Sequence, residues 1–320
     1  MRIFLAGATG AIGGRLVPLL LEAGHEVTGT TRSPAKADML RAAGAEPVIA
    51  DGLDRDAIVA AIAAARPDAI VHQLTALGDL TSLRNLDGAF ALTNRLRTEG
   101  TDNLLAGARE AGTRRFIAQS FTGWPYARTG GPVKTEDDPL DPDPVPSMSK
   151  TLTAIRRLEQ TVTQAGGIAL RYGGFYGPGT GLTPGGDQVE LIRKRRFPIV
   201  GDGGGVWSFI HIDDAAAATL AALERGTPGA IYNVVDDDPA PVREWLPALA
   251  AAAGAKPPRR LPRWLARVVA GESVATMMTE IRGASNAKAK RELGWEPAHP
   301  SWREGFRAAL QGRQDGGRRR

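Results

Sequence analysis

Three glycines near the start of the chain have the spacing of a phosphate-binding turn. Gly7, Gly10 and Gly13 follow the apolar run Arg2–Ala6 and precede a helical stretch, which is the context that this motif requires. Gly7 permits a tight turn, Gly10 lets the backbone approach a pyrophosphate, and Gly13 lets the helix and strand pack closely. The diphosphate would lie on helix N–H groups at the positive end of the helix dipole. The predicted dinucleotide contacts in this turn also include Thr9, Ala11 and Ile12.

The end of the second apolar run predicts which dinucleotide binds. An acidic residue there would bond the ribose 2′-OH of NAD(H). This chain reads Gly-Thr-Thr31-Arg32-Ser, with no carboxylate to repel a 2′-phosphate, and Arg32 could bind that phosphate through two hydrogen bonds. The sequence therefore favours NADP(H), although NAD(H) stays possible and Arg32 could instead stack on adenine or face water. Further predicted cofactor contacts are Thr31, Asp51, Gly52, Leu53, Leu74 and Tyr172; Asp51 could equally cap a helix near Asp54.

A parallel sheet is needed to position these residues. Short apolar runs alternate with helical stretches over the first two-thirds of the chain, which is typical of a doubly wound α/β fold of the Rossmann type. The near-continuous hydrophobicity of the runs fits strands covered on both faces. The predicted strands are Arg2–Ala6, Glu26–Thr30, Glu46–Ile49, Ala69–Gln73, Arg115–Gln119 and Ile168–Tyr172, with Ile231–Val235 returning to the main sheet.

The pattern predicts two lobes. Residues 1–172, joined by 205–240, would form the dinucleotide-binding domain, and residues 173–204 and 241–311 a smaller, mostly helical substrate lobe. The segment Ala127–Pro146 is dense in Gly, Pro and Asp, which predicts a long loop at the carboxyl edge of the sheet, where ligands bind in such folds. Residues 312–320 end in three arginines and are predicted to be a disordered basic tail.

Composition excludes several classes of protein. The 320 residues can bury a large core, no apolar run is long enough to span a bilayer, and the N-terminus lacks a signal-peptide pattern, so we expect a cytoplasmic protein. With no cysteine and no ligand spacing among the four histidines, no metal site is predicted. The pI near 9.7 has no accompanying docking motif, so no nucleic acid partner is expected. The expected partner is a small-molecule substrate, and the expected state is a monomer or homodimer.

Several longer motifs together resemble one family. They are Leu170-Arg-Tyr-Gly-Gly-Phe-Tyr-Gly-Pro-Gly179, Phe209-Ile-His-Ile-Asp-Asp214, Tyr232-Asn-Val234 and Leu293-Gly-Trp-Glu-Pro297, besides the glycine turn. With these motifs the chain resembles the extended short-chain dehydrogenase/reductases, also called NAD-dependent epimerase/dehydratases. The likeness covers nearly the whole chain. It implies a nicotinamide-dependent oxidoreductase but no particular reaction.

The resemblance also implies a catalytic Ser/Thr–Tyr–Lys arrangement. Ser120 matches the hydroxyl residue at the end of the fifth strand, where it would bond a substrate carbonyl and stabilise oxyanion charge, with Thr122 as a second hydroxyl. Ser120 could instead satisfy its own loop backbone. Lys150 resembles the Lys of the Tyr-x-x-x-Lys pair, but the Tyr position is Pro146, so the usual acid/base is missing. Lys150 could still hold the nicotinamide ribose, or it could be a solvated surface residue.

A second departure from the family concerns the substrate. In sugar-nucleotide epimerases an Arg two residues before the Phe-Ile-His motif clamps the substrate diphosphate, and here that residue is Trp207. An indole in place of a phosphate ligand favours a flat, apolar or aromatic substrate. Trp124, Tyr126 and Tyr176 could line the same cleft, or these rings could be core residues.

These features leave three candidate functions open. The first is NADPH-dependent reduction of a ketone, with the proton coming from water, Tyr126 or a substrate hydroxyl; in this the chain resembles atypical ketoreductases that tailor aromatic polyketides. The second is an epimerase or dehydratase with tightly held NAD, although that reaction needs an efficient base that the missing Tyr would have supplied. The third is a catalytically silent dinucleotide-binding sensor or regulator.

Overall fold

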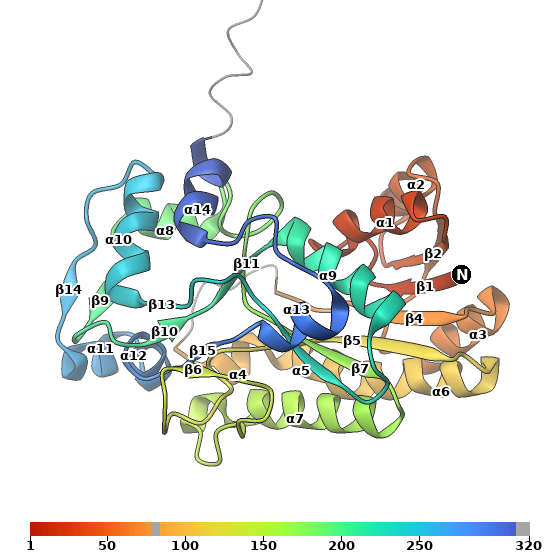
Figure 1. The fold of residues 1–320 in the computed structure, drawn as a ribbon, viewed down its shortest axis with the longest axis horizontal. Coiled ribbons are helices and arrows are strands. Elements are labelled where there is room, and N and C mark those ends of the chain that lie inside the picture. The colour runs from red at the N-terminus through yellow and green to blue at the C-terminus, as the bar shows by residue number, and fades with distance from the viewer. Residues whose placement is uncertain (78–83, 312–320) are drawn as a thin grey trace, which may run out of the picture.

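A seven-stranded parallel sheet forms the centre of the molecule (Figure 1). The computed structural model describes residues 1–77 and 84–311, so the predicted tail at 312–320 lies outside the described residues. The strand order is β12-β7-β5-β4-β1-β2-β3, which confirms the predicted doubly wound fold. The strands are β1 (Arg2–Ala6), β2 (Glu26–Thr31), β3 (Glu46–Ile49), β4 (Ala69–His72), β5 (Arg115–Phe121), β7 (Ile168–Tyr172) and β12 (Ile231–Val234).

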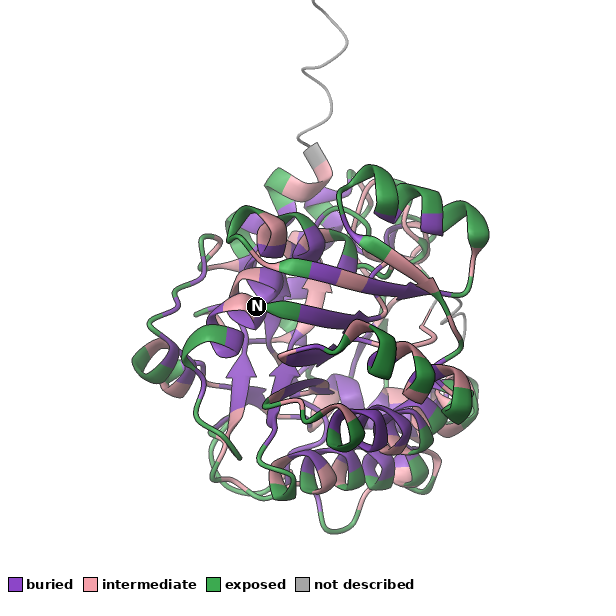
Figure 2. Ribbon diagram, turned by 90° about the vertical axis from the view of Figure 1, so that its right-hand side faces the viewer, coloured by how far each residue is buried: buried purple, intermediate pink, exposed green. Residues whose placement is uncertain are grey.

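Alternating side chains of each strand enter two different cores. In β1, Ile3 and Leu5 join one buried cluster, whereas Phe4 and Ala6 join another on the opposite face. Figure 2 shows that the strands are buried between the two helical layers. One layer contains α1 (Gly13–Glu22), α2 (Pro34–Ala42), α9 (Ile212–Arg225) and α13 (Ala287–Leu293), and the other contains α3 (Arg55–Ala65), α6 (Thr101–Ala111) and α7 (Ser149–Gln164).

On each edge strand of the sheet, one backbone donor is missing or already bonded. On β3, Pro47 has no N–H to offer a further strand. On β12, the N–H of Asn233 donates to Glu136 Oε1 at 2.7 Å. Glu136 lies in the long segment that was predicted to be a loop at this end of the sheet. That segment also contains β6 (Val133–Lys134), which pairs with β15 (Gly283–Ala284).

A second aromatic and aliphatic core lies beside the sheet. Phe209 is central to it, because its ring centroid lies 5.2 Å from that of Trp245 and 5.1 Å from that of Phe306. The elements around this core are α8 (Asp187–Arg193), α10 (Val242–Ala252), α11 (Arg263–Val269), α12 (Glu272–Thr279) and α14 (Trp302–Gln311), with the short strands β8 (Gly174–Tyr176), β9 (Ile199–Val200), β10 (Val206–Trp207), β11 (Phe209–His211), β13 (Ala240–Pro241) and β14 (Arg260–Leu261).

Short helical segments connect β4 to α6. They are α4 (Leu86–Ala89), α5 (Ala91–Arg95) and the π-helical turn η1 (Leu96–Gly100); a 3₁₀ turn, η2 (Pro146–Met148), precedes α7. No helix among the described residues is long and apolar enough to cross a membrane.

The predicted strands match the observed strands closely. The strands predicted at 2–6, 46–49 and 168–172 are found with the same bounds. The strand predicted at Ile231–Val235 returns to the main sheet as Ile231–Val234, and it pairs there with β7. The fifth strand ends two residues later than predicted, at Phe121, because its pairing with β7 continues to Tyr172.

Candidate active site

The glycine turn between β1 and α1 leaves no room for a side chain at Gly7 or Gly13. Gly7 has φ +91°, and its N–H donates to Thr30 Oγ1 at 3.0 Å. The N–H of Gly10 donates to the carbonyl of Gly7 at 3.1 Å. A Cβ on Gly13 would lie 2.3 Å from that same carbonyl oxygen. Close packing of the turn against the first helical turn therefore requires glycine at position 13.

A hollow of about 320 Å³ opens in front of this turn. It is lined by Thr9, Gly10, Ala11, Gly14, Arg15, Pro178 and Gly179. Within the described part of the chain, the N–H groups of Ala11 and Ile12 donate to no protein acceptor. These amides stand at the positive end of α1, the arrangement that binds phosphate. The turn therefore fits the diphosphate of a dinucleotide.

The end of β2 offers a cation and two hydroxyls. Thr31 is buried, and its Oγ1 accepts from Thr9 Oγ1 at 3.3 Å and from the Ser33 N–H at 3.2 Å. Arg32 is exposed and forms no ion pair with the described residues. The exposed guanidinium is thus available beside the glycine turn, and this turn contains no carboxylate.

The end of β3 meets the end of β4. A Cβ on Gly52 would lie 2.4 Å from Leu74 Cδ1, so these two predicted residues are neighbours. The carboxylate of Asp51 is exposed and accepts from the Leu53 N–H at 3.0 Å. It therefore stabilises its own turn, while Asp54 caps α3 by accepting from the Ala57 N–H.

Tyr172 lies in the core beneath this edge. Its side chain is fully buried, and its hydroxyl bonds Thr219 Oγ1 at 2.6 Å and Gln73 Nε2 at 3.2 Å. Burial raises its pKa to about 12. Direct cofactor contact, which the sequence predicted for Tyr172, stays a prediction.

Ser120 is part of a buried ion-pair network. Its hydroxyl donates to Glu159 Oε1 at 2.6 Å, and Ser120 is only 1% exposed. Arg171 binds the same carboxylate with two hydrogen bonds, Nε to Oε1 and Nη2 to Oε2, both 2.7 Å long. Ser120 and Arg171 are register partners on β5 and β7, and Glu159 reaches them from α7. A catalytic role for Ser120 stays a prediction that requires its hydroxyl to leave Glu159.

The network continues through Tyr126 and Thr122. Arg171 Nη1 donates to the Tyr126 hydroxyl at 2.8 Å, and that hydroxyl donates to Asn233 Oδ1 at 2.9 Å. Thr122 Oγ1 donates to the same Asn233 oxygen at 3.1 Å. Burial raises the pKa of Tyr126. Sequence reasoning missed Glu159, Arg171 and Asn233 because their partners lie far away along the chain.

All four tyrosines of the chain are fully buried. Besides Tyr126 and Tyr172, Tyr232 has a bonded hydroxyl, which accepts from the Thr227 N–H at 3.2 Å. The hydroxyl of Tyr176 has no hydrogen-bond partner and lies close to Gly305, while its ring packs edge-on against Phe306. Burial raises the pKa of Tyr176. No tyrosine hydroxyl is therefore presented to solvent for proton transfer.

Lys150 is exposed in the first turn of α7. Its backbone N–H donates to Asp87 Oδ2 at 3.0 Å, and the other oxygen of Asp87 accepts from the Thr151 N–H and hydroxyl, each at 2.7 Å. The Lys150 ammonium contacts no acceptor among the described residues. The structure does not bring it into the network around Ser120.

The two tryptophans predicted to contact substrate pack near one another. Trp124 is 7% exposed and belongs to an apolar cluster with Met277, against which Trp207 also packs. The half-buried Trp207 donates from Nε1 to the carbonyl of Met277 at 2.9 Å and lies 5.0 Å from Trp245 between ring centroids. Tyr176 lies in the separate aromatic core around Phe209.

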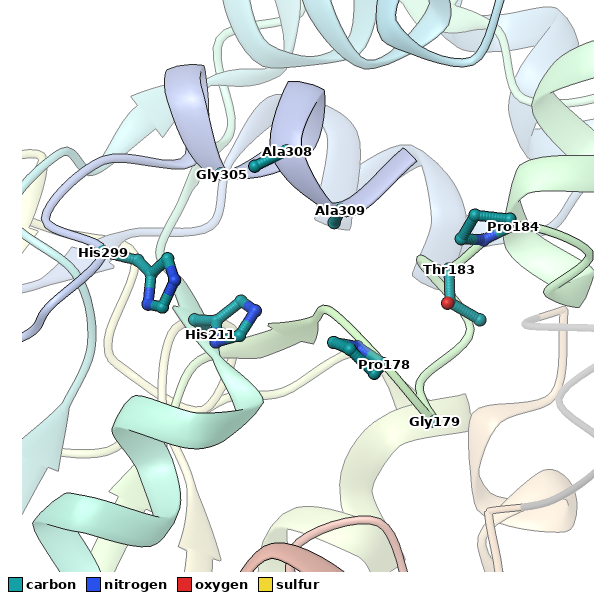
Figure 3. A pocket seen from close by; sticks show the side chains of 9 residues that line it. All are labelled: Pro178, Gly179, Thr183, Pro184, His211, His299, Gly305, Ala308 and Ala309. Carbon is teal, nitrogen blue, oxygen red and sulfur yellow. The ribbon is translucent and has the colours of Figure 1, made fainter. Parts of the chain in front are cut away.

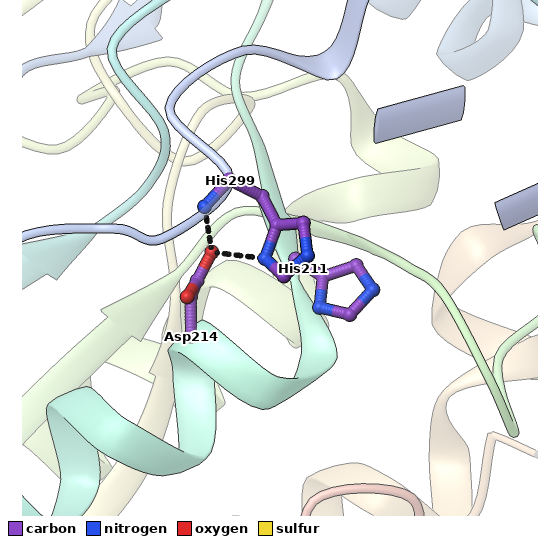
Figure 4. Close-up of side chains that lie close together, drawn as sticks. All are labelled: His211, Asp214 and His299. Atoms are coloured by element: carbon purple, nitrogen blue, oxygen red, sulfur yellow. Dashed lines mark hydrogen bonds and ion pairs between the residues drawn. The ribbon is translucent and has the colours of Figure 1, made fainter. Parts of the chain in front are cut away.

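A cluster of possible metal ligands also exists. His211, at the end of β11, and His299, between α13 and α14, lie beside a second hollow of about 430 Å³ (Figure 3). Figure 4 shows that Asp214 joins them. The imidazoles are stacked, with centroids 3.8 Å apart and planes 26° apart, so their in-plane lone pairs do not converge on one point. The Asp214 carboxylate already accepts from the Ala298 and His299 N–H groups, both at 2.9 Å.

Together, the parallel sheet and the glycine turn at its carboxyl edge define a Rossmann-type dinucleotide-binding fold. The chain belongs to the NAD dependent epimerase/dehydratase family, whose model matches residues 3–234. This confirms the resemblance stated from the sequence motifs.

Individual relatives cover nearly the whole chain. A Streptomyces protein named 3-diazoavenalumate denitrifying reductase is 45% identical over 310 residues, which are 96% of this chain and 99% of that protein. A Stigmatella aurantiaca protein named 4-hydroxy-2-methyl-3-oxo-4-farnesyl-3,4-dihydroquinoline-1-oxide ketoreductase is 28% identical and covers 92% of each chain. The crystal structure of Thermus thermophilus UDP-glucose 4-epimerase in complex with NAD has a TM-score of 0.73 at 24% identity, covering 97% of each chain, and is similar in fold.

Proposed function

We propose that this protein is an NADPH-dependent reductase that removes a diazo group from an aromatic small molecule. The observation that carries the proposal is the burial of all four tyrosines, which leaves no phenol to protonate a substrate. Carbonyl reduction consumes a proton as well as hydride, whereas replacement of a diazonium group by hydride does not. The Streptomyces relative, named as a denitrifying reductase of a diazo compound, supports this choice.

The reaction is balanced without an acid. NADPH would supply hydride, so that R–N₂⁺ becomes R–H, N₂ leaves with the electron pair of the C–N bond, and NADP⁺ remains. The protein has to hold the reactants together and keep water away, because much of the barrier to such a transfer is removed by positioning.

The cofactor preference is part of the proposal. Arg32 would bind the 2′-phosphate, and the amides of Ala11 and Ile12 would hold the diphosphate. The support is that Arg32 is exposed, that it forms no ion pair within residues 1–77 and 84–311, and that no carboxylate adjoins it in the sequence. NAD(H) would bind the same turn without that ion pair.

Isotope labelling tests the proposal. The purified protein is incubated with 4-carboxybenzenediazonium and NADPH deuterated at C4, and the benzoate formed is analysed by mass spectrometry. We expect deuterium on the ring carbon and one N₂ per NADPH consumed. Heat-treated protein measures direct reaction between the two reagents, and a rate no higher than this background would contradict the proposal.

Ketone reduction is the second candidate. The relative named as a quinoline ketoreductase favours it, and the proton would then come from water or from a hydroxyl of the substrate. An aromatic ketone turned over with a solvent isotope effect, together with an inert diazonium compound, would select this reaction. NADPH binding without turnover of either compound would instead support the sensor predicted as the third possibility.

A further inference from the structure

Arg97 is a buried guanidinium with most of its donors unused. It lies in the π-helical turn η1 and is 5% exposed. Nη1 donates one hydrogen bond to Asn94 Oδ1 at 3.3 Å, and the guanidinium carbon lies 5.7 Å from the Phe90 ring centroid. Among the described residues no carboxylate pairs with it. Because a guanidinium has five N–H donors, the other four have no protein acceptor there.

The neighbours of Arg97 place it at the carboxyl edge of the sheet. One turn earlier, Thr93 Oγ1 accepts from the N–H of Ala76, in the segment that follows β4, at 3.0 Å. The carbonyl of Leu96 contacts the ring of His72, the last residue of β4, at 3.3 Å. Burial and, to a smaller extent, the Arg97 charge lower the pKa of His72 to about 4. Arg97 is therefore close to the edge at which the glycine turn also lies.

The local charges do not balance. Burial lowers the pKa of Arg97 to about 10, so it stays charged at neutral pH, with Glu159 near enough to raise that pKa in part. Glu159 is already bound by Arg171 through two bonds and by Ser120. Buried charges are stable in proteins when they are paired and hydrogen-bonded. An anion from outside the chain would complete the environment of Arg97.

We propose that Arg97 binds an anionic oxygen of the substrate, a carboxylate or a phenolate, and thereby orients the aromatic ring in the site. Guanidinium groups bind planar oxyanions with two parallel hydrogen bonds. An anionic oxygen would also separate the cationic diazonium group from the cationic Arg97 side chain. This inference rests on the proposed function and names the substrate class of the same site.

Equilibrium binding tests the inference without turnover. The full chain, saturated with NADP⁺, is titrated in a calorimeter at pH 8.5 with benzoate and methyl benzoate, and with 4-nitrophenolate and 4-nitroanisole. We expect the anion of one pair to bind at least about 10-fold tighter than its neutral partner, as one charge-assisted hydrogen bond of roughly 1.4 kcal/mol would give. The pair that shows the preference identifies the oxygen. Equal binding within both pairs would overturn the inference.

Variants assign the preference to Arg97. Arg97→Met should erase it, and Arg97→Lys, which keeps a charge, should retain part of it. Arg95→Met is the matched control, because Arg95 is an exposed residue of α5 paired with Glu99, and it should leave the preference intact. If Arg97→Met does not fold, methylguanidinium added to Arg97→Ala should restore binding of the anion only.

Failure of the inference about Arg97 can be distinguished from failure of the proposed reaction. If Arg97→Lys weakens the anion and its neutral partner equally, the residue is structural and the inference is wrong. If the anion preference depends on Arg97 but the diazonium compound is not reduced, the inference stands as a binding site and the proposed reaction fails.

Discussion

Two regions at the carboxyl edge of the same sheet differ in what they leave available. In the glycine turn, the backbone amides of Ala11 and Ile12 have no acceptor within the described part of the chain, and the side chains are small. Around β5 and α7, the hydroxyl of Ser120, the carboxylate of Glu159 and the guanidinium of Arg171 bond one another. The first region leaves donors free for a ligand, whereas in the second these three side chains are already bonded to one another.

The contrast shows that a residue type at the expected place is not enough for chemistry. Ser120 ends β5, where the family resemblance implies a catalytic hydroxyl, yet its proton is donated to Glu159. A group that is fully bonded inside the protein has to break that bond before it can act on a substrate. The following predictions test whether the two regions really differ in this way.

A side chain at Gly13 should abolish cofactor binding. The Cβ of Gly13→Val would lie 2.3 Å from the carbonyl oxygen of Gly7, so the turn has to open. We expect NADPH affinity to fall by at least about 1,000-fold, equivalent to roughly 4 kcal/mol. Gly131→Ala, outside the turn, is the control, because beyond its chain neighbours its Cβ comes no closer than 3.9 Å to another atom. Calorimetric titration measures both, and similar affinities for the two variants would contradict the open-site description of the turn.

Removal of the charge on Glu159 should lower the free energy of unfolding of the protein, and not only its turnover rate. Glu159→Gln leaves Arg171 buried without a counter-charge, which costs about 3–5 kcal/mol. Urea unfolding measures this loss. Glu99→Gln, which breaks the exposed pair with Arg95, is the control and should cost much less. A small loss for Glu159→Gln would mean that the pair can rearrange and free Ser120.

Charge reversal at Arg32 should change the choice of cofactor. Arg32→Glu places a carboxylate where a 2′-phosphate would bind, so NADPH affinity should fall by about 100-fold, roughly 2.7 kcal/mol, with little change for NADH. Arg41→Glu, an exposed change on α2, should leave the ratio as it is. An equal loss of NADPH and NADH would remove Arg32 from phosphate binding.

Asp236 is a buried carboxylate that, unlike Glu159, forms no ion pair with any residue that the structure describes. It accepts from the N–H groups of Trp302 at 3.0 Å and Asp238 at 3.3 Å. Burial raises its pKa to about 8. The folded protein then holds a proton that the unfolded chain releases near pH 4, so stability should fall as the pH rises from about 4 to 8.

Replacement of Asp236 by Asn should flatten this pH dependence. The slope to be lost is at most about 1.4 kcal/mol per pH unit, measured by urea unfolding between pH 5 and 8. The exposed change Asp56→Asn should leave the slope in place. An unchanged slope in Asp236→Asn would assign the titration to another group.

The smallest effect is expected at Lys150. Its ammonium is exposed and has no acceptor among the described residues. Lys150→Met should therefore change turnover by less than about twofold and leave the free energy of unfolding nearly unchanged. A large drop in turnover with unchanged stability would show that Lys150 reaches the nicotinamide ribose after all.

The sequence alone predicted the glycine turn and the strands, because both depend on local backbone geometry. The positions of Gly7, Gly10 and Gly13 are specified by local rules for turns and helix starts, and strand alternation follows from local hydrophobicity. The bonding of Ser120 could not be predicted, because it depends on α7 bringing Glu159 to β5 and on β7 bringing Arg171 beside it. The meeting of His211 with His299 likewise depends on how the last helices return to α9.

The edges of the sheet have a consequence for chains at high concentration. An uncovered strand edge acts as a template on which another molecule can add its own strand, and that is a common route to aggregation. Here Pro47 presents no amide hydrogen at one edge, and Glu136 occupies the amide of Asn233 at the other. Growth of the sheet from molecule to molecule is thereby discouraged on both sides, even though its strands are strongly apolar.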